Sequence, residues 1–143
     1  MKKNKTLIAI DFGTKYLGLA VGQSLTKTAS PLTTLRVKKG IPDWQVLLNI
    51  FDEWEADCIV VGLPLNMDGS EQDFTQQTKK FIRRLQEKTD RPIFNFDERL
   101  TTVEAKSYLF EREKAKGLKK ERIDALSAVL ILESFLQHNH EII

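Results

Sequence analysis

The first forty residues alternate short apolar runs with turn-forming residues. Residues 6–10 form a continuous apolar run, typical of a central strand covered on both faces, which ends at the turn-forming segment 11–14. Residues 17–22 alternate bulky side chains with Gly and Ala, which predicts a second strand with one bare face. Residues 32–37 alternate more weakly and predict a third, more exposed strand that ends at 38–40. The chain is therefore expected to open with three antiparallel strands.

After residue 40 the period of the apolar positions changes from two to that of a helix. Apolar residues at positions 44, 47, 48, 51 and 54 form one helical stripe. Short β-branched or aromatic runs at 58–61 and 92–96 predict two more strands, with helices after each of them and a last helix from about 121 to 137. Strands joined by crossover helices run parallel. The order predicts an α/β fold with a five-stranded mixed sheet, three antiparallel strands followed by two parallel ones, and helices on both faces.

Length and composition place this architecture in one domain. The 143 residues are 41% hydrophobic and contain no repeat or low-complexity linker, so we expect a single domain over residues 1–143. That length leaves no room for the two lobes of a kinase. One cysteine and two histidines close to the C-terminus exclude a Cys/His zinc site. The apolar runs are too short for a signal peptide or a membrane span, which predicts a cytoplasmic protein.

Three carboxylates stand out by their positions. Asp11 follows the first strand and Glu98 follows the last one. Because parallel central strands end at the same edge of a sheet, we expect these two carboxylates to converge there. Asp124 lies in a helix segment, 123–132, that is apolar almost all round, where an unpaired carboxylate is costly. Each acid alone also has an ordinary interpretation, as a turn or capping residue for the first two and as a partner of the helix dipole for Asp124.

A shared cation would compensate all three acids. Carboxylate oxygens without imidazole or thiolate favour Mg²⁺ or Mn²⁺. Such ions activate water and stabilise the leaving oxygen in phosphodiester hydrolysis. Asp11, Glu98 and Asp124 are therefore candidate metal ligands and catalytic residues. Asp97 is expected to be structural, because adjacent residues of a strand point to opposite faces.

Four ordered motifs also carry a resemblance to a known family. They are IDFGTK (10–15) with GLAVG (18–22), VGLP (61–64) with Asn66, Asp68 and Gly69, DERLTT (97–102), and DALSA (124–128). The chain resembles the YqgF (RuvX) group of bacterial proteins, which have an RNase H-like fold, are similar to Holliday junction resolvases and are linked to maturation of the 5′ end of pre-16S rRNA. The resemblance runs nearly end to end. It implies that Asp11, Glu98 and Asp124 are the metal-binding catalytic acids.

Candidate substrate contacts lie in the motifs and in a basic turn. We expect contacts from Gly13, Thr14 and Lys15 in the first motif, from Asn66 in the loop 62–69, and from Arg99 beside Glu98, although Arg99 has the alternative of pairing with Asp97. The turn 114–122 has five basic residues against one acidic residue and a net charge of +4, in a chain of net charge +2. Placed before Asp124, its Lys119 and Lys120 are predicted to contact phosphates. A second basic cluster, at 79–91, has the alternative of being only a solvated helix face.

The expected function is metal-dependent nuclease activity on pre-rRNA, with ribosomal precursor particles as partners. The alternatives are a resolvase of branched DNA, a non-catalytic nucleic-acid-binding module of the same fold, and a relative of the actin and sugar-kinase group, whose phosphate loop residues 11–14 resemble. The kinase reading conflicts with the length of the chain, and the three acids argue against an inactive module. The sequence leaves RNA and DNA open as substrates, and monomer and homodimer as states.

Overall fold

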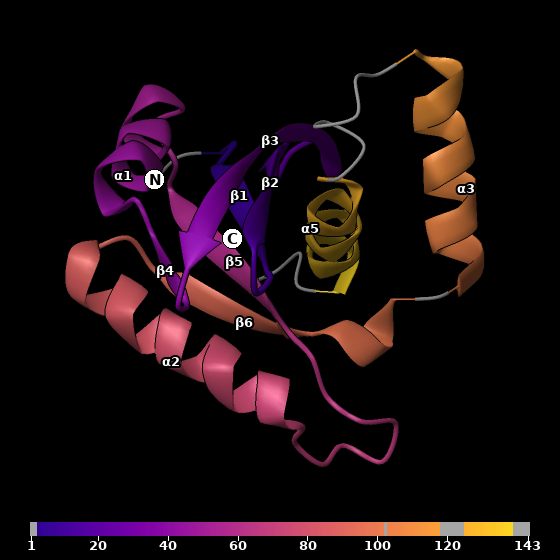
Figure 1. Cartoon of the computed structure of the whole chain (residues 1–143). Coiled ribbons are helices and arrows are strands. Elements are labelled where there is room, and N and C mark those ends of the chain that lie inside the picture. Colours follow the sequence, from indigo (N-terminus) through magenta and orange to yellow (C-terminus); the bar gives the residue numbers. More distant parts are fainter. Residues whose placement is uncertain (1–2, 102, 118–124, 139–143) are drawn as a thin grey trace.

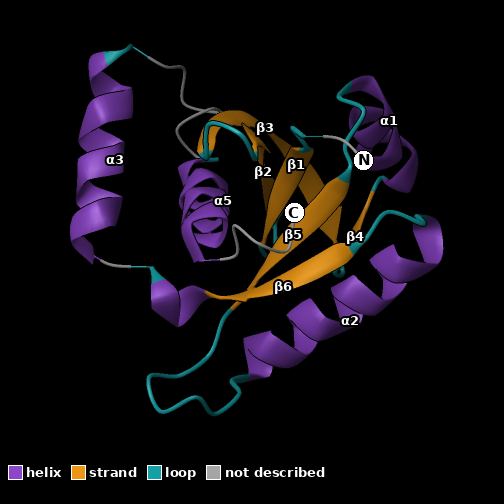
Figure 2. Cartoon of the chain, turned by 180° about the vertical axis from the view of Figure 1, so that it is seen from behind, coloured by secondary structure: helices purple, strands orange, loops and turns teal. Residues whose placement is uncertain are grey.

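A six-stranded sheet with helices on both faces forms the centre of the molecule (Figures 1 and 2). A computed structural model describes residues 3–101, 103–117 and 125–138. The strand order is β4-β3-β2-β1-β5-β6. The first three strands are antiparallel, and the last two are parallel to β1. Their bounds are β1 (Thr6–Phe12), β2 (Tyr16–Gln23), β3 (Thr28–Lys38), β5 (Cys58–Leu63) and β6 (Ile93–Asp97). The predicted α/β fold with a mixed sheet is confirmed.

One strand was not predicted, so the sheet has six strands rather than five. It is β4 (Ile41–Pro42), which pairs with the end of β3. Lys39 and Gly40 both have positive φ angles, 52° and 78°, and reverse the chain in a two-residue turn. A strand of two residues has no alternation of apolar and polar positions, which is why the pattern did not reveal it.

The helices divide between the two faces of the sheet. Figures 1 and 2 show α1 and α2 on one face and α5 on the other, with α3 packed against α5. Helix α1 begins after Asp43, whose side chain accepts hydrogen bonds from two backbone N–H groups of the first turn. No described helix is long and apolar enough to cross a membrane. The bounds are α1 (Trp44–Glu53), α2 (Asp73–Lys88), α3 (Val103–Ala115) and α5 (Leu126–His138).

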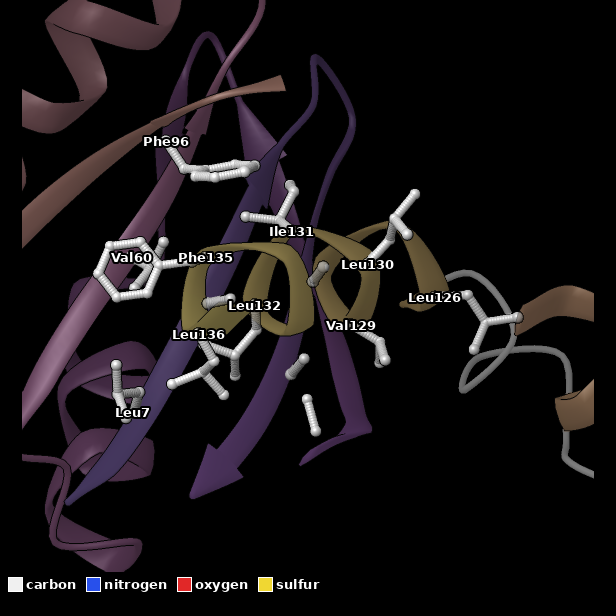
Figure 3. Close-up of a cluster of buried hydrophobic side chains, with 14 of the residues drawn as sticks. Leu7, Val60, Phe96, Leu126, Val129, Leu130, Ile131, Leu132, Phe135 and Leu136 are labelled. Carbon is white, nitrogen blue, oxygen red and sulfur yellow. The ribbon is translucent and has the colours of Figure 1, made fainter. Parts of the chain in front are cut away.

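Alternation along the strands divides the core into two clusters. Leu7 and Ala9 of β1 join the cluster around α5, whereas Ile8, Ile10 and Phe12 join the cluster beneath α1 and α2. The α5 cluster is drawn in Figure 3, where the apolar side chains of this helix lie against the sheet. Each fully buried side chain of this size contributes about 1.5–3 kcal/mol. Both faces of the central strands are therefore buried, as the continuous apolar run of β1 predicts.

Candidate active site

Two predicted metal ligands lie on the α5 face of the sheet at the carboxyl ends of the strands. Asp11 has the same strand parity as Leu7 and Ala9, which belong to the α5 cluster. Glu98 follows β6 directly, in the short 3-10 helix η1 (Glu98–Leu100), and Phe96 before it also faces α5. Asp11 and Glu98 are both partly buried. The structure thus brings together two acids that are 87 positions apart in the sequence.

A glycine on the strand between them provides the space. Val61 of β5 pairs with Ile10, so Gly62 lies beside Asp11, on the strand that separates β1 from β6. A Cβ atom at Gly62 would lie 3.2 Å from both Cγ and Cδ of Glu98 and 2.5 Å from Cδ1 of Ile131. The Glu98 side chain therefore lies over the bare backbone of β5. A larger residue would fill the space that Glu98 occupies.

Burial disfavours the ionised form of both acids, and repulsion from Asp11 adds to this effect at Glu98. Burial raises the pKa of Asp11 to about 6, and the positive charge of Lys106 acts in the opposite direction. Burial also raises the pKa of Glu98 to about 7, with a further contribution from the negative charge of Asp11. Two carboxylates that are costly to ionise side by side are typical of a site that needs a positive charge.

The chemistry of these side chains fits a divalent cation. Carboxylate oxygens are the hard ligands that Mg²⁺ and Mn²⁺ prefer, and a cation would remove the repulsion that raises the pKa of Glu98. The described residues contain no group of three His, Cys, Asp or Glu side chains that could hold a metal. Asp124, the third predicted ligand, lies outside the described residues. The three-acid site therefore stays a prediction. Two of its three acids, Asp11 and Glu98, are among the described residues.

Lys106 of α3 is a charged residue of this site that sequence reasoning missed. Its positive charge lowers the pKa of both Asp11 and Glu98, and its Nζ lies 5.9 Å from the centre of the Phe110 ring. The sequence alone offered no signal for it, because Lys106 is one charge among several on an exposed helix. Only the packing of α3 against α5 brings this lysine toward the sheet edge.

Arg99 adopts the alternative that was left open for it. Its Nε and Nη2 donate to Oδ2 of Asp97 at 3.0 and 2.6 Å, and its Nη1 donates to the backbone oxygen of Met67 at 3.4 Å. Hydrogen bonds from Arg99 keep the pKa of Asp97 below its usual range. Asp97 is therefore paired with an arginine, whereas a contact between Arg99 and substrate stays a prediction. Arg99 also ties the end of β6 to the loop after β5.

The sequence places the chain in a family. It matches the family described as "RuvX: Holliday junction resolvase" over residues 5–138. The chain belongs to the RuvX family. A relative from Haemophilus ducreyi, named "Putative pre-16S rRNA nuclease", is 54% identical over 134 residues, which are 94% of this chain and 97% of the relative. A relative of the same name from Shewanella denitrificans is 48% identical over 141 residues, which are 99% of this chain and 100% of the relative.

The fold agrees with membership in the RuvX family. The structure of T. thermophilus RuvC in complex with a Holliday junction substrate superposes with a TM-score of 0.57 and 16% identity, over 95% of this chain and 97% of that chain. A second Thermus thermophilus RuvC structure also gives 0.57, at 13% identity, over 94% and 97% of the two chains. These likenesses confirm the predicted RNase H-like fold. The family description and the names of the relatives are those of enzymes that act on nucleic acids.

The loop after β5, in which Asn66 was a candidate substrate contact, is held by its own hydrogen bonds in this RuvX chain. Asn66 Nδ2 donates to Ser70 Oγ at 2.9 Å, and Ser70 donates from its backbone N to Asp68 Oδ1 at 2.9 Å. The N–H of Gly69 donates to the backbone oxygen of Asn66 at 2.8 Å. The side-chain nitrogen of Asn66 thus organises the loop. A contact between Asn66 and substrate stays a prediction.

The structure describes some of the remaining candidate substrate contacts and not others. Thr14 and Lys15 are exposed in the turn between β1 and β2, next to the partly buried Gly13 and directly after Asp11 and Phe12. This turn therefore lies at the sheet edge that carries the acids. Lys119 and Lys120 lie outside the described residues.

Proposed function

We propose that this chain is a divalent-metal-dependent nuclease that hydrolyses phosphodiester bonds in the maturation of the 5′ end of pre-16S rRNA. The observation that carries the proposal is the pair of partly buried acids, Asp11 and Glu98, which share one sheet face, with Glu98 over the bare Gly62. Burial raises the pKa of both acids, so their ionised forms, which would bind the cation, are poorly stabilised without one.

Each residue of the site has a proposed task. Asp11 and Glu98 would hold the cation, together with Asp124 as the third predicted ligand. When bound, Mg²⁺ or Mn²⁺ lowers the pKa of a water molecule and stabilises negative charge on the phosphate. Lys106 adds a positive charge beside the two carboxylates, which favours the approach of a phosphate. Gly62 keeps the space above β5 free for the Glu98 side chain.

The substrate is proposed from the relatives. Two relatives that share about half of their residues with this chain over nearly their full lengths are named for action on pre-16S rRNA. We extend that substrate to this chain, with ribosomal precursor particles as the physical context. The family description names Holliday junctions, so resolution of branched DNA is the second candidate. Junction resolution needs two symmetric sites and therefore normally a homodimer, whereas rRNA trimming has no such requirement.

One cleavage experiment separates these candidates. The full chain is incubated with a precursor rRNA 5′ segment and, in parallel, with a four-way DNA junction, each in Mg²⁺, Mn²⁺ or EDTA. The proposal predicts cleavage of the rRNA segment with either metal and none in EDTA. Cleavage of the junction alone would support the second candidate. Absence of metal-dependent cleavage of both substrates would refute nuclease function.

A further inference from the structure

A cavity of about 300 Å³ opens beside the β1–β2 turn, on the sheet face opposite to Asp11 and Glu98. It lies between that turn, the β3–β4 turn and helix α2. We call it the basic pocket and define it by its lining residues, which include Phe12 and the polar side chains Thr14, Lys39, Gln77, Lys80 and Arg84. It contains three positive charges and no carboxylate.

Two of the three pocket cations, Lys80 and Arg84, belong to the basic cluster at 79–91, and they differ from other members of that cluster in their partners. Within that cluster Lys79 forms an ion pair with Glu71, and Arg91 forms one with Asp52 at 2.9 Å. Lys88 lies over the ring of Trp44, with its Nζ 5.7 Å from the ring centre. In the part of the chain that the structure describes, no acidic side chain forms an ion pair with Lys39, Lys80 or Arg84. Among the described residues, the positive charge of the basic pocket is therefore not compensated by an ion pair.

The aromatic residue of the pocket is not available for stacking on a base. The Phe12 side chain is only 4% exposed, and its ring stacks on Phe81 and Phe74 at centre-to-centre distances of 4.9 and 5.7 Å. The pocket can therefore recognise a ligand through positive charge and through hydroxyl and amide hydrogen bonds. Those are the groups that bind phosphate oxygens without reading a base sequence.

The position of the pocket connects it to the acids. Asp11 and Phe12 are consecutive in β1 and point to opposite faces, and the exposed Thr14 and Lys15 lie between the two faces in the next turn. A small anion can contact either the acid site or the basic pocket, but not both at once. A polynucleotide carries a phosphate on every nucleotide, so it can contact the acid site and the basic pocket at once.

We infer that the basic pocket binds the phosphate backbone of the nucleic-acid substrate as it passes around the end of β1. The inference rests on the proposed nuclease function and adds a second contact surface to it. The ligand class is a polynucleotide, held by charge rather than by sequence. Loss of the pocket charges should weaken binding similarly for all sequences.

The test is the salt dependence of binding, measured without catalysis. A fluorescein-labelled single-stranded RNA from the precursor 5′ segment is titrated with the full chain in EDTA, between roughly 50 and 200 mM KCl, and followed by anisotropy. The pocket variants are Lys80→Gln/Arg84→Gln and, on a different element, Lys39→Asn, since asparagine tolerates the positive φ of that position. The control Lys3→Gln/Arg83→Gln removes two exposed charges outside the pocket.

Each lost phosphate contact should reduce the slope of log affinity against log salt by about 0.7. We expect reductions of about 1.4 for the double variant and about 0.7 for Lys39→Asn, with about tenfold weaker binding at low salt for the double variant. The control should behave as the wild type. Circular dichroism spectra verify folding, and Lys39→Asn keeps the test valid if the α2 variant unfolds.

Several results would overturn the inference. An unchanged slope in both pocket variants, or an equal loss in the control, would contradict a phosphate contact in the pocket. Full competition by millimolar inorganic phosphate or AMP would identify the ligand as a small anion. A wild-type dimer that the double variant dissociates in sedimentation experiments would identify the pocket as a subunit interface. If the wild type binds RNA through the pocket but cleaves nothing in Mg²⁺, the proposed nuclease function is refuted, whereas the inference that the basic pocket binds RNA is retained.

Discussion

The two faces of the sheet differ most where Asp11 and Phe12 follow one another. On the α5 face the bare Gly62 leaves room for the Glu98 side chain, and burial disfavours the ionisation of both Glu98 and Asp11. On the α2 face the Phe12 ring is buried and stacks on Phe74 and Phe81, and no acid lines the adjacent pocket. Two consecutive residues of β1 thus belong to different environments. Asp11 lies in a site whose ionised acids are poorly stabilised without a cation, and Phe12 lies in a well-packed core. Chemistry and stability are located on opposite faces of the same strand end.

The largest expected effect comes from removing an acid. Asp11→Asn or Glu98→Gln should reduce the rate of rRNA cleavage in Mg²⁺ by about a thousandfold, because cation chemistry supplies several kcal/mol to such a reaction. Initial rates on the precursor segment measure this effect. Asp97→Asn is the matched control. Because Asp97 is bound by Arg99, this substitution should leave most of the cleavage rate intact. An equal loss in the control would argue against the distinction between these neighbouring acids.

On the opposite face the expected effect is on stability. Phe12→Ala should lower the free energy of unfolding by about 3–5 kcal/mol, because it removes a buried ring from an aromatic stack. Urea denaturation followed by circular dichroism measures the loss. Phe12→Leu, which keeps most of the apolar volume, should lose less and should still cleave. A loss below about 1 kcal/mol for the alanine variant would show that this face is not the packed one.

A smaller structural effect is expected at the glycine between the acids. Gly62→Ala places a methyl group against Ile131 and Glu98, and should cost about 1–3 kcal/mol of stability and displace the Glu98 side chain. The double variant Gly62→Ala/Ile131→Val relieves only the contact with α5. Its stability should recover in part while cleavage stays low. Recovery of cleavage together with stability would mean that the glycine serves packing against α5 alone.

The smallest effect is a pH dependence of stability in EDTA. Folding raises the pKa of Asp11 from 3.8 to about 6 and that of Glu98 from 4.5 to about 7. Between about pH 4 and pH 7 the folded protein therefore holds protons that the unfolded chain has released, so the free energy of unfolding falls as pH rises, by about 2 kcal/mol after allowance for partial exposure.

Glu98→Gln removes one of the two titrating groups and should flatten this pH dependence. At pH 8 the variant should be more stable than the wild type in EDTA, and at pH 4 the two should be alike. Thermal denaturation at the two pH values compares them. Equal stability at both pH values would contradict the raised pKa of Glu98.

Periodicity predicted the architecture and the meeting of two acids. The continuous run before Asp11 required a central strand, and the short strand before Glu98 required a parallel neighbour on the same sheet. Parallel strands end at one edge, so Asp11 and Glu98 were expected together, and they are. The two-residue strand β4 was missed because it is too short to show a period. Asp124 lies outside the described residues, so its part of the site remains a prediction.

Other parts of the site depend on packing between elements, which local patterns do not record. Gly62 was assigned to the loop 62–69 but lies in β5, and its role became visible only when the structure placed it under Glu98. Lys106 reaches the acids through the packing of α3 on α5. Of the basic residues on α2, the sequence could not tell which were paired and which lined a cavity. Arg99 had two alternatives, and the structure pairs it with Asp97.

The most direct test of the central claim is Mn²⁺ binding to the full chain, measured by calorimetry at about pH 8, where both acids ionise readily. The wild type, Asp11→Asn, Glu98→Gln and the exposed-loop control Asp68→Asn are compared. We expect saturable binding by the wild type and the control, and about tenfold weaker binding by the two site variants. Equal Mn²⁺ affinity in all four proteins would contradict the assignment of Asp11 and Glu98 as metal ligands.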